Sequence, residues 1–221
     1  KLNSLSGLGF IKNCVFEVIV STYGINHTPN AAPMGIMTDG MRRLIMKPYT
    51  TSQTYRNILF HKHAVINITS DPIIYYRTAF KDANPYKRVP IDWFEKADLV
   101  NAPKLNNADA CIEVKAIKIE NKKRDRAKVL CEVVNISILN TVPKSYCRAN
   151  FALIESIIHA TRIKVFLSKD EKEKVKELIK LVKYYDALVK RVAPSSIYSD
   201  IMKEILKRIE DWKAKSKIEK T

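Results

Sequence analysis

Hydroxyl side chains gather in the first third of the chain, where an apolar stretch ends and a short amphipathic run begins. They are Thr50, Thr51, Ser52 and Thr54. At a strand-to-helix joint the first backbone N–H groups of the helix lack intrahelical acceptors and the helix dipole is positive. Hydroxyls and N–H groups together can then hold an anion, which indicates a phosphate-bearing ligand. An ordinary Ser/Thr helix cap explains the same residues, and local sequence alone favours it.

The elements that position this joint are expected within residues 29–71. Asp39-Gly40 is the strongest two-residue hairpin signal in the chain, and it separates two β-rich runs. The pattern predicts strands over 30–38 and 42–49, a brief helix over 52–60, and a strand over 64–69. The hydroxyls therefore fall between the second of these strands and the helix.

Three further runs are typical of strands, namely residues 14–22, 110–120 and 127–140. Hairpins join most of the predicted strands, which favours an antiparallel barrel over a doubly wound sheet. Residues 71–107 are broken by prolines and carry the pairs Tyr75-Tyr76 and Trp93-Phe94, so we expect this excursion to pack onto the barrel. The glycine-rich turn of a dinucleotide fold is absent, and five glycines assemble no other phosphate loop.

The composition changes near Pro143, and helical periodicity begins at Arg148. Apolar spacing predicts three helices, which we interpret as a C-terminal appendage. Ser168 and Glu171 have the spacing of a capping box for the second helix, and Pro194 is expected to end it. The residues expected to form the apolar stripes are Phe151, Ile154, Ile158 and Thr161 in the first helix, Val175, Leu178, Ile179, Val182, Tyr185, Val189 and Val192 in the second, and Ile197, Ile201, Ile205, Ile209 and Trp212 in the third. The predicted domains are residues 1–146 and 147–221.

Composition indicates which classes of protein this chain can belong to. The 221 residues are 46% hydrophobic and 28% charged, as in a soluble globular protein, and the formal net charge is +16. Without a membrane-length apolar run or signal peptide, we expect a cytoplasmic protein. Cys14, Cys111, Cys131 and Cys147 form no C-x-x-C pair, so no metal site or disulfide is predicted.

A basic cluster marks the predicted tip of the 110–140 hairpin. Its residues are Lys122, Lys123, Arg124, Arg126 and Lys128. Such a cluster could contact nucleic acid, and we keep this as a less favoured alternative to an anionic cofactor.

Several motifs together resemble one known family. PNAAPMGIM, TSQTYRNI and AVINITSD, with the later VLCEVV and RANFALIESIIHATR, look like the archaeal flavin-binding split-barrel proteins of unknown function. The sequence is more distantly similar to flavin reductases and pyridoxamine phosphate oxidases. The resemblance covers most of residues 14–165. It implies an α+β fold, mainly β, with an antiparallel split β-barrel followed by the three-helix appendage.

The resemblance also implies FMN as cofactor and a homodimer with the flavin near the subunit interface. By position, backbone groups of the first strand of the motif would line the isoalloxazine, at Asn30, Ala31, Ala32, Pro33 and Met34. Thr50, Thr51, Ser52 and Thr54 would take the phosphate, helped by Lys47 or one of Arg42 and Arg43. Second-rank candidates are Tyr55, Asn57, Asn67 and Thr69. Arg148 and Asn150 begin the family-like helix and are explained equally well by packing.

No acid, base or nucleophile stands out. His27, His61 and His63 are near the candidate site in sequence, but H-K-H spacing is more typical of a surface pair than of a metal or proton-transfer site. His159 is expected to be a satisfied structural histidine. We therefore expect an FMN-dependent oxidoreductase of unknown substrate and electron donor. The alternatives are a non-catalytic flavin-binding or regulatory module and, less favoured, a deazaflavin-dependent reductase or the nucleic-acid binder.

Overall fold

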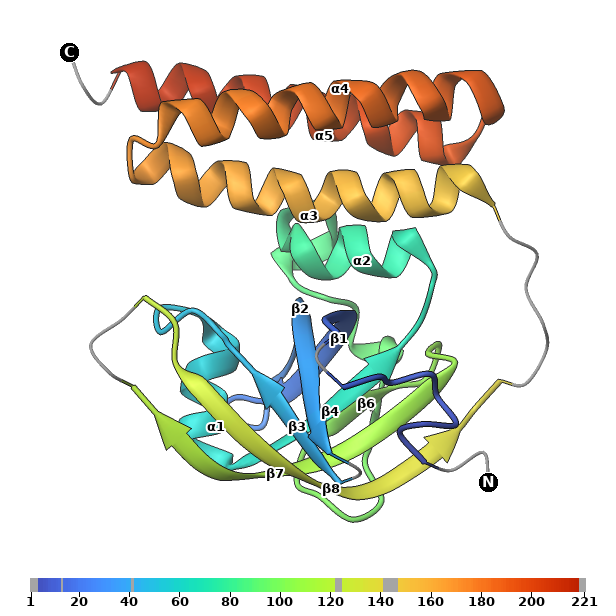
Figure 1. The fold of residues 1–221 in the computed structure, drawn as a ribbon, viewed down its shortest axis with the longest axis vertical. Helices are drawn as coiled ribbons and strands as arrows, with labels where there is room; N and C mark the ends of the chain where they lie inside the picture. The colour runs from blue at the N-terminus through green and yellow to red at the C-terminus, as the bar shows by residue number, and fades with distance from the viewer. Residues whose placement is uncertain (1–3, 13, 41, 122–124, 141–146, 219–221) are drawn as a thin grey trace. The chain divides into compact units, whose positions relative to one another are not determined.

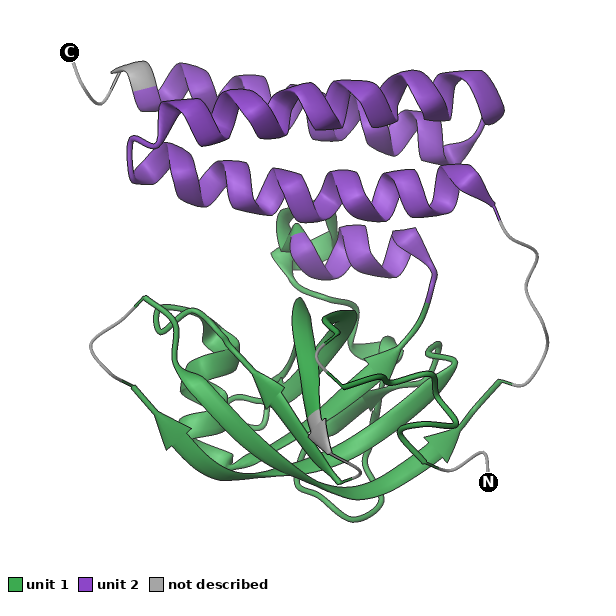
Figure 2. Cartoon of the chain, viewed as in Figure 1, with its two compact units in different colours: residues 1–69, 80–143 green, residues 70–79, 144–221 purple. Residues whose placement is uncertain are grey.

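A computed structural model describes residues 4–12, 14–40, 42–121, 125–140 and 147–218. The chain divides into two compact units (Figure 2). Unit 1 comprises residues 1–69 and 80–143, and unit 2 comprises residues 70–79 and 144–221. Three residues of the predicted basic tip, Lys122, Lys123 and Arg124, and the change of composition at Pro143 lie outside the described residues.

Unit 1 is built on a closed antiparallel barrel of six strands, in the order β1-β2-β3-β8-β7-β4 (Figure 1). The strands are β1 (Phe16–Tyr23), β2 (Pro29–Gly40), β3 (Arg43–Met46), β4 (His63–Ile68), β7 (Ala110–Glu120) and β8 (Lys128–Ile138). The predicted antiparallel barrel is confirmed. One strand is far shorter than expected: the run predicted over 42–49 pairs only from Arg43 to Met46, and Pro48 has no N–H for a ladder beyond it.

The barrel interior is apolar because alternate residues of each strand point inward. Val18 and Val20 of β1 lie in one buried cluster with Ile36 of β2 and Ile66 of β4. Leu5 and Phe10, from the segment before β1, are buried in the same cluster. The segment before β1 therefore contributes to the barrel core.

The rest of unit 1 is short elements. Helix α1 (Gln53–His61) follows β3. Three short 3-10 helices come next in the excursion, η1 (Lys81–Ala83), η2 (Pro85–Lys87) and η3 (Ile91–Trp93), and a two-stranded sheet of β5 (Phe94–Lys96) and β6 (Pro103–Leu105) follows them.

Two buried polar side chains attach this excursion to the barrel. The carboxylate of Glu113 on β7 accepts from the backbone N–H groups of Asp98, Leu99 and Val100, at 3.2, 2.6 and 3.0 Å. On β4, Asn67 accepts from the N–H of Leu105 at 2.7 Å. Residues 80–107 therefore belong with the barrel, as predicted.

Unit 2 consists of helices α2 (Pro72–Ala79), α3 (Arg148–Ser168), α4 (Lys172–Val192) and α5 (Ile197–Ile218). Helix α2 packs against α3, so residues 72–79, with Tyr75 and Tyr76, belong to the same unit as the C-terminal helices. The prediction that they pack onto the barrel was wrong. The three predicted C-terminal helices are present, and α4 ends just before Pro194 as expected. Among the described helices, none has the length and apolarity needed to cross a membrane.

Two details of the helices were predicted wrongly. The capping box is not formed: Ser168 is the last residue of α3, its hydroxyl donates to the carbonyl of Val165 at 2.7 Å, and α4 begins after Glu171 without a side-chain cap. The buried side of α3 is also different, because Leu153, Ile157 and Ile163 are buried while Phe151 is 44% exposed. Helix α3 packs against α2, α4 and α5, so a single stripe does not describe what it buries.

The apolar stripes of α4 and α5 largely agree with the prediction. Val175, Val182 and Val189 are buried on α4, and Ile201, Ile205 and Ile209 on α5. The ends of the stripes are open, since Val192 and Ile197 are exposed. His159 is buried on α3, but its Nδ1 has no hydrogen-bond partner among the described residues, so it is not the satisfied histidine that was expected.

Candidate cofactor site

Strand β2 has an open backbone edge along its first half. It pairs with β1 from Pro29 to Ile36, whereas β3 pairs with it only from Ile36 to Gly40. Within the described part of the chain, no strand pairs with the other side of residues 29–35. Alternate residues of this segment direct both their N–H and their C=O away from β1, as in any antiparallel ladder. The barrel is therefore split at this place, and backbone donors and acceptors are available there.

The positions of two prolines indicate which residues face the open side. A proline in a strand weakens the ladder least where its nitrogen faces away from a partner. Pro29 and Pro33 have the same parity in β2. We infer that Ala31 and Gly35, with that parity, direct their N–H groups to the open side.

The five residues predicted to line a flat ring do not share one side-chain face. Asn30, Ala32 and Met34 lie opposite Thr22, Val20 and Val18 of β1, on the face that is the barrel interior. Ala31 and Pro33 are on the other face, and Ala31 is completely buried. What the five residues share is the backbone edge. Lining by backbone groups therefore stays a prediction, and lining by all five side chains is excluded.

The start of helix α1 lies next to this edge. The hydroxyl of Ser52 accepts from the N–H of Tyr55 at 3.2 Å, so Ser52 is the N-cap, as the ordinary cap interpretation expected. Among the described residues, the N–H groups of Gln53 and Thr54 have no protein acceptor. Thr50, whose N–H donates to the carbonyl of Asp125 at 2.9 Å, and Thr51, which is exposed, precede the cap. The joint thus offers N–H donors and hydroxyls together.

A chain of side-chain hydrogen bonds connects the edge of β2 to α1. Asn30 donates to the hydroxyl of Thr54 at 3.4 Å, and Asn30 Oδ1 in turn accepts from Nζ of Lys81 on η1. Asn30 and Thr54 are buried, and burial lowers the pKa of Lys81. Lys81 is the functional candidate that the sequence did not suggest. No local motif marks it, because only the fold brings it to Asn30 from the excursion.

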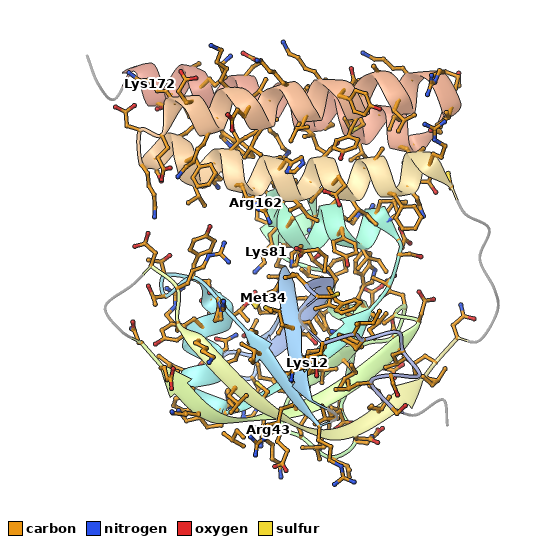
Figure 3. The ribbon with its side chains drawn as sticks, viewed as in Figure 1. Lys12, Met34, Arg43, Lys81, Arg162 and Lys172 are labelled. Atoms are coloured by element: carbon orange, nitrogen blue, oxygen red, sulfur yellow. The ribbon has the colours of Figure 1, made fainter. Side chains whose placement is uncertain are left out.

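Figure 3 shows Lys81 and Met34 at the same end of the barrel, with Arg43 at the opposite end. Arg43 pairs with Gly40, ten residues along β2 from Asn30, which corresponds to about 30 Å of strand length. Arg42 and Arg43 are therefore badly placed to assist a phosphate at Thr50 to Thr54. Lys47 is exposed just before that joint.

Two other cations contact the joint directly. The guanidinium of Arg56 donates to the carbonyl of Thr51 at 3.0 Å. That of Arg126 donates to the carbonyl of Lys47 at 3.2 Å and lies 3.9 Å from the centre of the Tyr49 ring. Both guanidinium groups are at the surface, where an anion can reach them.

The second-rank candidates have different roles. Asn57 on α1 is buried; it donates to the hydroxyl of Thr22 at 2.9 Å and accepts from Gln53 at 2.6 Å, so it holds α1 to β1. Tyr55 is buried in the same helix. Thr69 is buried just beyond β4.

Asn67 is not brought to the site. It lies opposite Ile19 on the face away from the barrel interior, donating to the carbonyl of Ile19 at 2.9 Å and the hydroxyl of Ser21 at 2.8 Å. Its oxygen accepts from Leu105 and from the thiol of Cys111. These contacts leave no polar atom of Asn67 for a ligand.

The histidines form a small cluster at the other end of α1. Nε2 of His61 is 2.9 Å from the carbonyl oxygen of Gly24, and the ring of His61 is 5.4 Å from that of His27. His63 accepts from the N–H of Asn101 at 3.2 Å. Burial, Lys115 and His61 all lower the pKa of His63. The described residues include no group of His, Cys, Asp or Glu side chains suited to a metal ion.

Arg148 and Asn150, at the start of α3, belong to unit 2. The amide of Asn150 donates to the carbonyl of Ser70 at 3.1 Å, and both residues are in that unit. Packing within unit 2 therefore accounts for Asn150.

Comparisons with known proteins agree with this architecture. The chain is similar to a solved structure, the FMN-bound protein MM1853 of Methanosarcina mazei, with 25% identity and a TM-score of 0.73. The match covers 92% of this chain and 99% of that one. The chain is also 26% identical over 183 residues to the uncharacterized protein MJ1453 of Methanocaldococcus jannaschii, covering 80% of this chain and 90% of the relative. The α+β split-barrel fold expected from the sequence is thereby confirmed.

Two family models match nearly the whole chain. Residues 16–140 match the N-terminal domain of the protein of unknown function DUF447, and residues 147–211 match the DUF447 model that covers the C-terminal part. The expected resemblance to an archaeal split-barrel family of unknown function is confirmed, and the chain belongs to the DUF447 family.

Proposed function

We propose that this protein binds FMN in unit 1 and uses it in an oxidoreductase reaction. The observation that carries the proposal is the match over 92% of the chain to a family member that is FMN-bound. The residues present fit such a group: the N–H donors at the start of α1 suit a phosphate, and the open edge of β2 suits a flat ring with hydrogen-bonding atoms along one side. The flavin would supply the hydride or electron chemistry itself.

Each part of the site then has a defined task. The N–H groups of Gln53 and Thr54, with the hydroxyl of Thr51, bind the phosphate, and Arg56 and Arg126 add positive charge. The hydroxyl of Thr50 donates to the carbonyl of Asp125 at 3.3 Å and closes the joint from the other side. The backbone of Asn30 to Gly35 orients the ring. Lys81, held by Asn30, places a cation beside this edge. Ser52 and Asn57 position α1 and need not touch the cofactor.

Binding is tested first by titrating purified protein with FMN, riboflavin and FAD and following flavin fluorescence and visible absorbance. FMN is expected to bind more tightly than riboflavin because only FMN carries the phosphate. Protein that contains no flavin as purified and takes up no FMN would refute the proposal.

One variant isolates the backbone contribution to phosphate binding. Proline is tolerated at the first position of a helix, and Ser52, which precedes it, has the extended conformation that proline favours in its neighbour. Gln53→Pro therefore removes one N–H while keeping α1. A hydrogen bond to a charged group contributes ~1.5–3 kcal/mol, so FMN should bind roughly 10- to 100-fold more weakly while riboflavin is little affected.

Gln53→Ala is the matched control. It removes the bonds from the Gln53 side chain to Asn57 and Arg56 but keeps the backbone N–H. It should retain the preference for FMN over riboflavin. Equal loss of FMN affinity in both variants would place the effect in the side chain and contradict the backbone site.

Turnover is a separate question. Mixing the flavin-loaded protein with NADH or NADPH under anaerobic conditions should bleach the flavin if a nicotinamide is the donor, and an added acceptor should restore its colour. Bound flavin that stays inert to both nucleotides and to other small reductants would favour the alternative of a non-catalytic flavin module.

The homodimer is part of the same proposal. We expect the loaded protein to have the mass of two chains in light scattering coupled to gel filtration. A monomer with full FMN affinity would show that the site in unit 1 is complete in one chain.

A further inference from the structure

A cleft of about 600 Å³ opens in unit 2, where α3 ends and α4 begins, with the last turns of α5 on its other side. This volume is within the range of ~300–1,000 Å³ typical of pockets for small molecules. We call it the lysine-rimmed cleft, after the residues described below.

The floor of the cleft is apolar. Phe166 and Leu167 contribute from the end of α3, and Val175 and Ile179 from the first turns of α4. Val175 is buried, whereas Phe166, Leu167 and Ile179 are only partly covered by the rest of the chain. The helices therefore leave an apolar surface that a ligand with a hydrocarbon or ring body would cover.

The rim of the cleft is strongly basic. It has five lysines against two acidic residues, which are Lys172, Lys176, Lys180, Lys183 and Lys213 against Asp170 and Glu171. Lys172 is 3.9 Å from Asp170, and Lys213 is 3.1 Å from Glu210. No carboxylate of the described residues forms an ion pair with Lys176, Lys180 or Lys183, so these three cations are available to a ligand.

The spacing of these lysines is unfavourable in the free protein. Lys172, Lys176 and Lys180 follow one another at intervals of four residues, which puts like charges side by side on one face of α4. Lys172 is also in the first turn of the helix, whose dipole is positive at that end. An anion held at the rim would relieve these repulsions.

We propose that the lysine-rimmed cleft binds a free small amphiphile that has one anionic head, a carboxylate or a phosphate, and an apolar body. The body lies on Phe166 and Ile179, and the head lies among Lys176, Lys180 and Lys183. A second copy of the chain is disfavoured as the occupant, because a symmetric contact through this cleft would bring two basic rims together.

The test is calorimetric titration of the full-length protein with four ligands that share a ten-carbon tail: decanoate, decyl phosphate, decan-1-ol and decyltrimethylammonium. All are used below the concentrations at which they form micelles. The two anions should bind with a stoichiometry near one, the alcohol more weakly, and the cation not at all. Equal binding of anion and alcohol would refute the role of the lysines.

The variants locate the site. Lys176→Glu with Lys180→Glu should weaken binding of decanoate by roughly tenfold, because each exposed charge pair changes an affinity by a few-fold. Lys207→Glu is the control, since Lys207 is an exposed lysine on α5 that does not line the cleft. It should change the affinity less than the double variant does. Ile179→Asn should weaken binding of anion and alcohol alike, and circular dichroism would verify that its helices are intact.

Two results would overturn the proposal. One is the absence of heat and of any decanoate-dependent rise in melting temperature. The other is co-sedimentation with vesicles of anionic phospholipid that the double variant abolishes while free decanoate does not compete, which would assign the lysines to a membrane surface. Neither result depends on whether unit 1 binds FMN.

Discussion

The Nζ atom of Lys81 donates a hydrogen bond to Oδ1 of Asn30, a residue 51 positions earlier in the chain. Asn30 then donates to Thr54 of α1, so one chain of contacts joins η1, β2 and the helix. In the proposed site this places a cation beside the open edge of β2. Lys81 carries this charge only below its pKa, and burial lowers that pKa.

The first prediction concerns that charge. Removing a cation beside a bound flavin should disfavour the reduced, anionic form. Lys81→Met should therefore lower the two-electron reduction potential of bound FMN by roughly 20–40 mV, equivalent to ~1–2 kcal/mol. The potential is measured by equilibration with a reference dye. Lys87→Met, at an exposed lysine nearby in sequence, should leave it unchanged, and an unchanged potential in Lys81→Met would remove Lys81 from the site.

The second prediction uses the N-cap of α1. Aspartate caps a helix about as well as serine, so Ser52→Asp should preserve stability while adding a negative charge at the joint. FMN should bind more weakly to this variant and riboflavin about equally well. Ser52→Ala should instead lower the free energy of unfolding by ~1 kcal/mol with less effect on the ratio of the two affinities. Should both variants shift that ratio equally, the phosphate does not lie at this joint.

The third prediction separates structure from ligand binding at Asn67. Asn67→Leu leaves the N–H of Leu105 and the carbonyl of Ile19 without their side-chain partner. Each unsatisfied buried group costs ~1–3 kcal/mol, so for the two groups we expect a loss of ~2–6 kcal/mol in the free energy of unfolding, measured by urea denaturation. FMN affinity, measured well below the melting temperature, should stay close to that of the unmodified protein. Asn107→Ala, at an exposed position, is the control, and a selective loss of FMN affinity would return Asn67 to the site.

The fourth prediction concerns pH. Burial, then Lys115 and His61, lower the pKa of His63 below 6.5 in the folded chain. A folded-state pKa below the unfolded one means that the unfolded chain binds more protons. The contribution of His63 to stability is thus fully present above pH 6.5 and is lost as pH falls through the folded-state pKa.

The matched variant for this prediction is His63→Asn, whose side-chain oxygen can still accept from Asn101 but does not titrate. Between neutral and mildly acidic pH, the melting temperature of the unmodified protein should fall more than that of His63→Asn. Parallel curves would show that other groups, His159 included, account for the pH dependence.

Local sequence was enough to predict the barrel strands, α1 and the three C-terminal helices, but not α2 or the short helices and strands of residues 81–105. Strand β7 has the predicted bounds, and α1 starts at the predicted cap because both features depend on neighbours in the chain. Pairing length was not predictable, since the four-residue match of β3 to β2 depends on the partner strand. The capping box failed for a related reason: Asp170 adopts a positive φ and turns the chain before α4 begins.

The candidate site was predicted in part. The hydroxyl joint and the β2 segment are near each other, as the bond between Asn30 and Thr54 shows. Lys81 comes from a distant segment, and no local pattern marks it. Arg126 was singled out only as part of the basic hairpin tip, because the fold alone brings it to the joint. The sequence could not separate two roles for Asn67. A buried asparagine that hydrogen-bonds neighbouring strands and one that binds a cofactor have the same local sequence, and only the hydrogen-bond partners distinguish them.

The open edge of β2 has a consequence for the protein before it is loaded. An unpaired strand edge is a template for another strand, and natural proteins cover such edges or interrupt them. Pro29 and Pro33 interrupt this one only in part. If a flavin ring hydrogen-bonds to the remaining backbone donors and acceptors, the cofactor covers the edge as a neighbouring strand would. The protein without flavin should then be the form that self-associates on storage.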